Sequence, residues 1–176
     1  MTQRTWLITG VNSGFGRLIT EVLLERGDRV AGTVRKLEAM NDLKAKYGDR
    51  LWLANLDMTE LPAVRSVVNK VFAELGTIDV IVSNAGYGLF GAAEELSDEQ
   101  VAHQLATNLF GPIQLIRAAL PHLRAQGGGR IIGLSPTAGR RRFREAPFTM
   151  RASGDWKVSW IQSPRNLHHS GLAFRS

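Results

Sequence analysis

Apolar segments alternate with amphipathic segments up to about residue 140. Short apolar runs bounded by glycine or polar residues predict buried strands at 4–9, 29–34, 51–56, 78–82 and 130–134. Helical spacing of apolar positions predicts helices at 14–26, 37–46, 61–75 and about 98–125. Strands that alternate with helices across short connections indicate a parallel sheet with both faces covered. The predicted fold class is α/β, a Rossmann-type doubly wound parallel sheet in a single domain that is incomplete on its C-terminal side.

Two of the predicted helices carry more specific expectations. The apolar face of 14–26, expected to pack on the sheet, holds Phe15, Leu18, Ile19, Val22 and Leu23. The long helix 98–125 should begin with a capping box formed by Ser97 and Gln100, and the prolines at 112 and 121 should kink or divide it. Its apolar residues occupy more than one face, which is typical of a helix buried on two sides; they are Leu105, Leu109, Ile113, Leu115, Ile116 and Leu120.

Composition narrows the function classes. The chain of 176 residues has no cysteine, which excludes disulfides, thiol catalysis and cysteine-based metal sites. No apolar run approaches the roughly 18 residues of a membrane span, and the N-terminus does not resemble a signal peptide. We therefore expect a cytoplasmic protein with no membrane partner. The net charge of +6 arises entirely after residue 139: residues 140–176 hold eight basic and two acidic side chains.

A glycine-rich turn stands between the first predicted strand and the first predicted helix. It reads Thr9, Gly10, Val11, Asn12, Ser13, Gly14, Phe15, Gly16. Gly10 permits the tight turn, Gly14 lets a pyrophosphate approach the backbone, and Gly16 allows close helix–strand packing. The strand–turn–helix context favours a dinucleotide site. The alternative is a glycine-rich turn with no ligand.

The spacing of these glycines resembles the cofactor loop of the classical short-chain dehydrogenase/reductase family. Further motifs match that family in order: Asp57 after the third strand, Asn84-Ala85-Gly86 after the fourth, and Asn108 on the long helix. The resemblance covers about residues 4–139. It implies that Asp57 contacts the adenine ring, that Asn84, Ala85 and Gly86 line the cofactor, and that Asn108 is a catalytic residue holding a water in a proton relay.

The end of the second predicted strand bears on the choice of cofactor. An acidic residue there would bind the ribose hydroxyls of NAD, but the chain has Thr33-Val34-Arg35-Lys36. Arg35 could make a bidentate contact with a 2′-phosphate, which favours NADP over NAD. The alternative is that Arg35 and Lys36 simply begin a solvated helix.

The catalytic motif of the family is not found. The resemblance calls for a Tyr with a Lys four residues later, acting in proton transfer beside a hydride-carrying cofactor. The only tyrosines are Tyr47 and Tyr87, and neither has that Lys. Ser135-Pro136 stands where the family has Ser-Ser, and the second, catalytic position is Pro136. Ser135 could replace the catalytic Ser only if the loop shifts.

The tail provides an interpretation of this loss. Residues 148–162, back-translated and read from the last base of each codon, allow YHASKWGLEGFVDS, which resembles the family's Tyr-xxx-Lys segment. We interpret the sequence from about residue 142 as a frameshift product, which also accounts for the step in charge. A genuine basic tail that binds phosphates is the alternative, but we expect no nucleic-acid partner. His168-His169 has no further ligands at metal spacing, so we expect no metal.

Two functional hypotheses remain. The domain expected at 1–140 binds NAD(P), and 141–176 is an irregular basic tail. Either the lineage is an NADP-dependent oxidoreductase interconverting a small-molecule ketone and alcohol, or this chain is a catalytically inactive dinucleotide-binding remnant. The family implies a homo-oligomer. Without the missing segment, the strand at 130–134 should be an open sheet edge that promotes aggregation.

Overall fold

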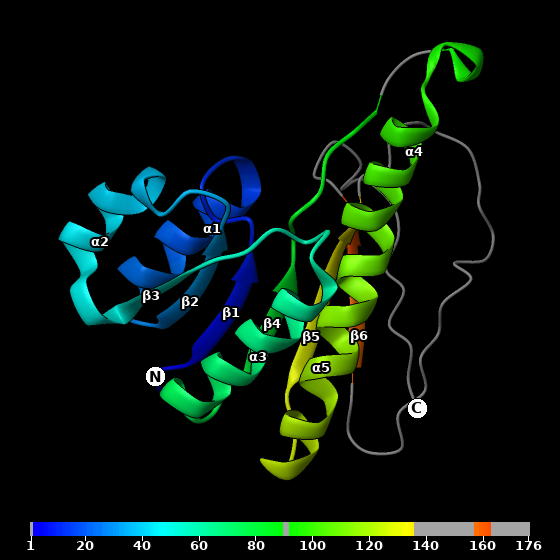
Figure 1. The fold of residues 1–176 in the computed structure, drawn as a ribbon. Helices are drawn as coiled ribbons and strands as arrows, with labels where there is room; N and C mark the ends of the chain where they lie inside the picture. The colour runs from blue at the N-terminus through cyan, green and yellow to red at the C-terminus, as the bar shows by residue number, and fades with distance from the viewer. Residues whose placement is uncertain (1, 90–91, 136–156, 163–176) are drawn as a thin grey trace.

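A computed structural model describes residues 2–89, 92–135 and 157–162. These residues build one parallel sheet of six strands in the order β3-β2-β1-β4-β5-β6 (Figure 1). The strands are β1 Thr5–Thr9, β2 Arg29–Val34, β3 Leu51–Asn55, β4 Val80–Ser83, β5 Arg130–Ser135 and β6 Lys157–Gln162. The predicted doubly wound Rossmann-type sheet is confirmed, and the five predicted strands appear with ends shifted by one or two residues.

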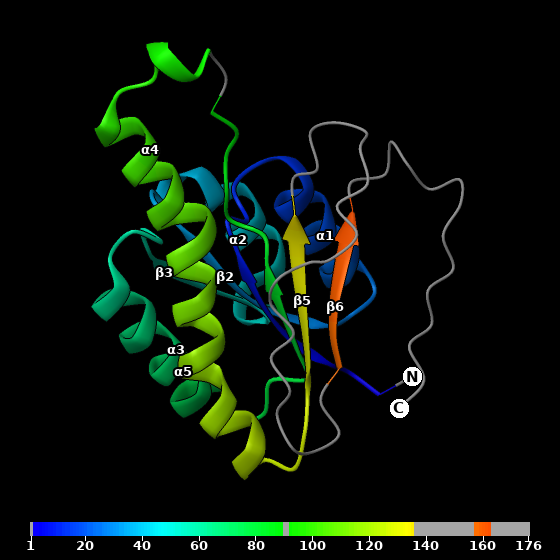
Figure 2. The same cartoon turned by 90° about the vertical axis from the view of Figure 1, so that its right-hand side faces the viewer.

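Helices lie on both faces of this sheet (Figure 2). One face carries α1 Gly14–Glu25 and α2 Asn41–Tyr47; the other carries α3 Leu61–Leu75 and α5 Gly111–Ala125. Strand residues alternate between the two cores: Leu7 packs on the α3–α5 side and Ile8 on the α1–α2 side. Short 3₁₀ helices lie between these elements at Leu37–Met40, Gly48–Arg50 and Ala93–Glu95.

Helix α1 has nearly the predicted extent, but only part of the predicted face is buried: Leu23 lies in the core and Ile19 packs against it. Phe15, Leu18 and Val22 are 44%, 59% and 60% exposed, whereas the buried residues are Gly16, Thr20, Leu23 and Leu24. The physical reason is close packing at the first turn of the helix. A Cβ at position 16 would overlap the carbonyl oxygen of Gly10, so small residues must face the strand and larger apolar ones turn away.

The long helix predicted at 98–125 is three segments in succession. α4 Asp98–Leu105 begins with the predicted capping box, a π-helical turn covers Ala106–Phe110, and α5 follows. The π-helical turn comes just before Pro112, which has no N–H to bond a carbonyl of the preceding turn. Pro121 lies inside α5 and does not end it. Leu115 and Ile116 are buried, whereas Leu105 and Leu109 remain 44% and 43% exposed.

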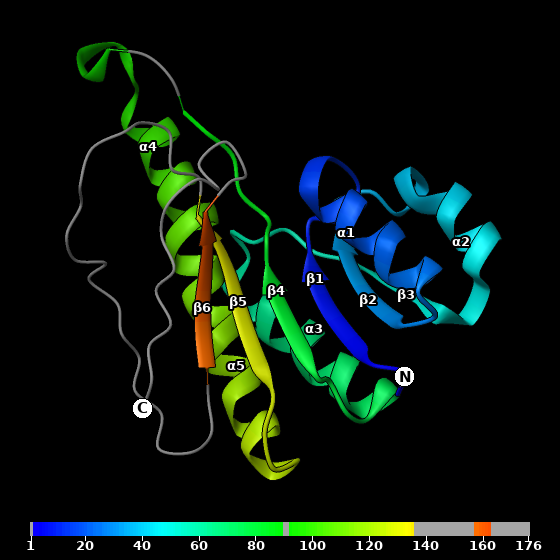
Figure 3. The ribbon, with the colours of Figure 1, turned by 180° about the vertical axis from the view of Figure 1, so that it is seen from behind.

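The expectation of an open edge at β5 is wrong. Strand β6 pairs in parallel with β5 along its whole length, from Arg130 opposite Lys157 to Ser135 opposite Gln162 (Figure 3). This strand lies within the part of the chain expected to be irregular. The sequence of β6 contains Val158, Trp160 and Ile161, residue types enriched in strands. Because β5 and β6 are separated by more than 20 residues, the sequence of β6 alone does not predict that it pairs with β5.

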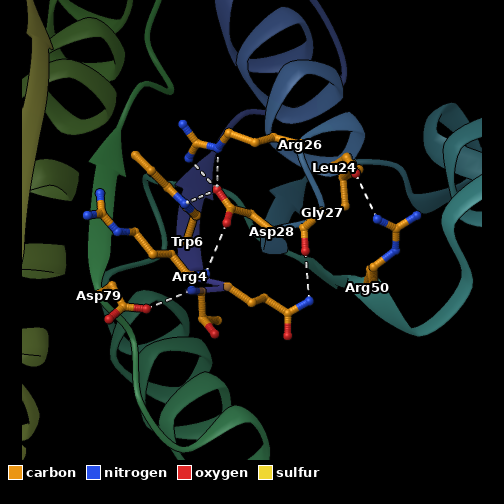
Figure 4. A network of polar contacts seen from close by, with 10 residues as sticks. Arg4, Trp6, Leu24, Arg26, Gly27, Asp28, Arg50 and Asp79 are labelled. Atoms are coloured by element: carbon orange, nitrogen blue, oxygen red, sulfur yellow. Dashed lines mark hydrogen bonds and ion pairs between the residues drawn. The ribbon is translucent and has the colours of Figure 1, made fainter. Parts of the chain in front are cut away.

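A polar network ties the amino ends of β1 and β2 together (Figure 4). The buried Asp28 carboxylate accepts hydrogen bonds from the backbone N–H of Arg4 at 3.0 Å, the indole of Trp6 at 3.1 Å and the Nε of Arg26 at 3.0 Å. Burial alone raises the pKa of Asp28, but these donors outweigh it and hold the pKa below its ordinary value. The network lies at the edge of the sheet opposite the candidate site.

Candidate functional site

The candidate site residues meet at the carboxyl ends of the parallel strands. Neighbouring strands β1 and β4 have crossover connections on opposite faces, since α1 follows β1 on one face and α5 precedes β5 on the other. In open α/β sheets, ligands bind outside the carboxyl ends of the strands at such a switch point. The segments after β1, β2, β3 and β4 supply Thr9 to Gly16, Arg35, Asp57, and Asn84 to Gly86.

The turn after β1 has the backbone geometry that its glycines predict. Gly10 and Gly14 adopt positive φ angles of 72° and 54°. A Cβ at Gly14 would meet nothing within 4 Å, so this point of the backbone is open to an approaching group. Asn12, Ser13 and Gly14 are exposed, and the N-cap Ser13 makes no side-chain bond to the helix. The first N–H groups of α1 therefore remain to donate to an anion, which fits a pyrophosphate.

Thr9 and Asn84 join this turn to the end of β4. The Thr9 hydroxyl is fully buried and accepts the backbone N–H groups of Asn84 and Ala85, both at 3.0 Å. The Asn84 amide donates in return to the carbonyl oxygens of Thr9 at 2.8 Å and Gly10 at 3.0 Å. The two cofactor motifs thus form one hydrogen-bonded unit although they are more than 70 residues apart along the chain.

Arg35 is an exposed cation at the carboxyl end of β2, followed by the exposed Lys36. It follows the last residue of β2, and none of the ion pairs found among the described residues involves it. Arg17, which follows Gly16 directly, is instead bound to Glu21 at 2.9 Å and to Asp42 of α2. Of these two arginines, Arg35 is therefore the one whose guanidinium is available to an anion at the carboxyl end of β2.

Asp57 follows β3 and stays ionised in its surroundings. The backbone N–H of Thr59 donates to its carboxylate at 2.9 Å, and the Thr59 hydroxyl donates at 2.8 Å. The backbone hydrogen bond lowers the pKa of Asp57 most, and the hydroxyl hydrogen bond lowers it less. Burial acts in the opposite direction but is outweighed. The positive charges of Arg35 and His103 lower the pKa further. Asp57 is thus an acceptor-only group, which suits hydrogen-bond donors such as an adenine amino group.

Asn108 lies on the π-helical turn between α4 and α5. Its Oδ1 accepts the backbone N–H of Tyr87 at 3.1 Å, and its Nδ2 donates to the Tyr87 carbonyl oxygen at 2.7 Å. One lone pair and one N–H of the amide are left for a water. The water-holding role suggested by the family resemblance remains a prediction.

Ser135 is the last residue of β5, and its backbone pairs with β6. Pro136 lies outside the described residues. Of the segment interpreted as out of frame, only β6 is described. Sequence reasoning missed a contact between Tyr87 and His103, for which no motif exists.

In the described ranges, no three His, Asp or Glu side chains group to hold a metal ion. No helix among those ranges is long and apolar enough to cross a membrane.

The fold is of the Rossmann type, and the turn after β1 has the backbone geometry of a dinucleotide-binding loop. A sequence model described as short chain dehydrogenase matches residues 4–148. The chain therefore belongs to the short chain dehydrogenase family, whose members bind nicotinamide dinucleotides and act on small molecules.

Two curated relatives illustrate the similarity. The chain is 36% identical over 133 residues to a 3-ketodihydrosphingosine reductase of Bacteroides thetaiotaomicron, covering 76% of this chain and 47% of the relative. It is 35% identical over 134 residues to the NADP-dependent 3-hydroxy acid dehydrogenase YdfG of Escherichia coli K12, covering 76% of this chain and 54% of the relative. The chain thus spans about half the length of the curated relatives that it matches.

Solved structures agree on the fold. A short-chain dehydrogenase from Streptomyces avermitilis superposes with a TM-score of 0.74 at 40% identity, over 77% of this chain and 50% of that one. A metagenomic short-chain oxidoreductase in complex with NADP superposes with a TM-score of 0.73 at 30% identity, over 78% and 64%.

Proposed function

We propose that residues 1–140 are an NADP-binding domain from an oxidoreductase lineage that interconverts a small-molecule carbonyl compound and an alcohol. The observation that carries the proposal is the exposed Arg35 guanidinium after β2, where an NAD-binding protein would place an acid. The relative named as NADP-dependent and the neighbouring structure in complex with NADP support the same choice.

The residues divide the binding work among them. In this proposal, the N–H groups of the turn from Asn12 to Gly16 hold the pyrophosphate, and Phe15 presents only its backbone. Arg35 holds the 2′-phosphate, Asp57 binds the adenine, and Asn84, Ala85 and Gly86 line the cofactor. A bound nicotinamide would supply the hydride, Asn108 would hold a water of the proton relay, and Ser135 would replace the catalytic Ser only if its loop shifts.

We further propose that the chain as written binds the cofactor without turning substrate over. Tyr47 and Tyr87 are its only tyrosines. Tyr47 is buried in the α1–α2 core, and the Tyr87 hydroxyl is bonded to His103. Neither has a lysine four residues later to lower the pKa of its phenol. The segment from about residue 142 is the proposed out-of-frame tail, and resequencing the gene around codons 135–150 tests that origin.

Titration calorimetry with NADPH and NADH tests the binding proposal. We expect tighter binding of NADPH, and an Arg35→Ala variant should lose about 10- to 100-fold of that affinity, the range of a charge-assisted hydrogen bond, while NADH binding changes little. Arg124→Ala is the matched control, because Arg124 is also exposed but lies in the last turn of α5, at the other edge of the sheet. Equal affinities for the two cofactors, or tighter NADH binding, would contradict the role of Arg35.

A second assay separates binding from catalysis. The purified chain, incubated with NADPH and a panel of ketones, should show no oxidation of NADPH above background. A rate that disappears in an Asn108→Ala variant would show that the chain is an enzyme and that its proton donor lies elsewhere.

A further inference from the structure

The segment that leaves β4 is fastened to the helix α4 and its π-helical turn by three hydrogen bonds. Two of them join the backbone N–H and carbonyl of Tyr87 to the side-chain amide of Asn108. The third joins the Tyr87 hydroxyl to Nδ1 of His103 at 2.7 Å. The two rings also contact each other, with centroids 5.6 Å apart and planes inclined by 51°. Tyr87 is thus held both by its backbone and by its side chain.

The other end of this segment is fastened to the cofactor turn. Asn84 and Ala85 are bonded to Thr9, and Asn84 also to Gly10. Only Gly86 lies between the two sets of bonds, and a Cβ there would come within 3.0 Å of Oδ1 of Asn108. The four residues from Asn84 to Tyr87 therefore bridge the turn after β1 and the helix α4. A displacement of Tyr87 would reach Ala85 through Gly86 alone.

His103 lies close to the same edge of the sheet. Its charge is among the smaller causes that lower the pKa of Asp57, behind the Thr59 hydrogen bonds and the charge of Arg35. The geometric link to the cofactor turn runs along the chain: Tyr87, bonded to His103, is separated by Gly86 alone from Ala85, which is bonded to Thr9.

We propose that Tyr87 is a positioning residue for the dinucleotide, and that its hydrogen bond to His103 fixes the course of the segment Asn84–Tyr87 that lines the cofactor. The inference rests on the proposed cofactor binding. It assigns to His103, a residue outside every cofactor motif, an effect on cofactor affinity that acts through Tyr87. The bond lies at an exposed position, so its net contribution is that of one neutral hydrogen bond.

A double-mutant cycle on the NADPH dissociation constant tests the proposal. Tyr87→Phe removes the hydroxyl and keeps the ring; His103→Leu removes the imidazole that the hydroxyl bonds. Each should weaken NADPH binding about 3- to 10-fold, and the double variant should be no weaker than either single one, because all three lack the same bond. His103→Asn places a polar atom near the position of Nδ1 and should restore most of the affinity. A general loss of packing would not be restored by this smaller side chain.

Two controls match these variants. Tyr47→Phe removes a tyrosine hydroxyl from the α1–α2 core, and His122→Leu removes a helical histidine that stacks on Phe72 of α3. Neither should change NADPH binding. Unchanged affinity in Tyr87→Phe, or losses that multiply in the double variant, would overturn the positioning role. If the unmodified chain fails to bind NADPH at all, the proposed function itself is wrong, so the two failures are distinguishable.

Discussion

The Thr9 hydroxyl offers a sharp test of how the two cofactor motifs are joined. A Thr9→Val substitution keeps the shape of the side chain and removes its oxygen. The backbone N–H groups of Asn84 and Ala85, each 3.0 Å from that oxygen, then lose their acceptor in a partly buried position. An unsatisfied buried N–H costs about 1–3 kcal/mol, so the loss of the acceptor for two such groups should lower the free energy of unfolding by about 2–6 kcal/mol. That loss is a large share of a typical domain stability of about 5–15 kcal/mol.

Thr20→Val is the matched control, because Thr20 is equally buried. Its hydroxyl donates only to the carbonyl oxygen of Gly16, at 2.8 Å, and that oxygen keeps its place in the helix when the hydroxyl is removed. The control should lose no more than about 1 kcal/mol. Urea unfolding followed by circular dichroism measures both variants, with a lower midpoint at an unchanged slope for Thr9→Val. If the two variants are destabilised equally, the Thr9 hydroxyl does not organise the site.

Three further predictions concern stability. Asp28→Asn should lower the free energy of unfolding near neutral pH, because the pKa of Asp28 is depressed in the folded chain. The difference from the unmodified chain should shrink as the pH falls below about 4 and the folded carboxylate becomes protonated. A difference in urea unfolding that does not depend on pH would contradict this. The Tyr47 hydroxyl is buried and has no hydrogen-bond partner among the described residues, so Tyr47→Phe should leave the free energy of unfolding unchanged or raise it by up to about 1 kcal/mol, whereas a clear loss would reveal a hidden partner. Leu105 and Leu109 remain exposed, so we expect a chain of marginal stability that tends to aggregate. Restoring the alternative reading frame after about residue 142 should raise its stability. A sharp, cooperative melt above about 60 °C for the unmodified chain would refute this.

Local pattern was sufficient for most of the fold. The apolar runs located β1 to β5, and the capping box located the start of α4. The pattern failed for α1, where Phe15 and Val22 were expected to be buried. Hydrophobic spacing does not register that a small residue is required where the helix touches Gly10. Strand β6 was missed because pairing with β5 depends on residues distant in sequence.

The candidate site was predictable to the extent that it consists of motifs. The glycine turn and Asn84-Ala85-Gly86 meet at one edge of the sheet, as parallel strands require. The hydrogen bonds that join them were not predictable, because they depend on the register of β1 against β4. The contact of Tyr87 with His103 spans 16 residues and belongs to no known spacing rule, so only the structure brings it into view.

The central claim is that this edge of the sheet recognises the 2′-phosphate of NADP through Arg35. The most direct measurement is calorimetric titration with adenosine 2′,5′-bisphosphate and adenosine 5′-monophosphate, two nucleotides that differ in that phosphate alone. The account predicts that the bisphosphate binds about 10-fold or more tightly, and that Arg35→Ala removes the preference. Equal binding of the two nucleotides to the unmodified chain would contradict it.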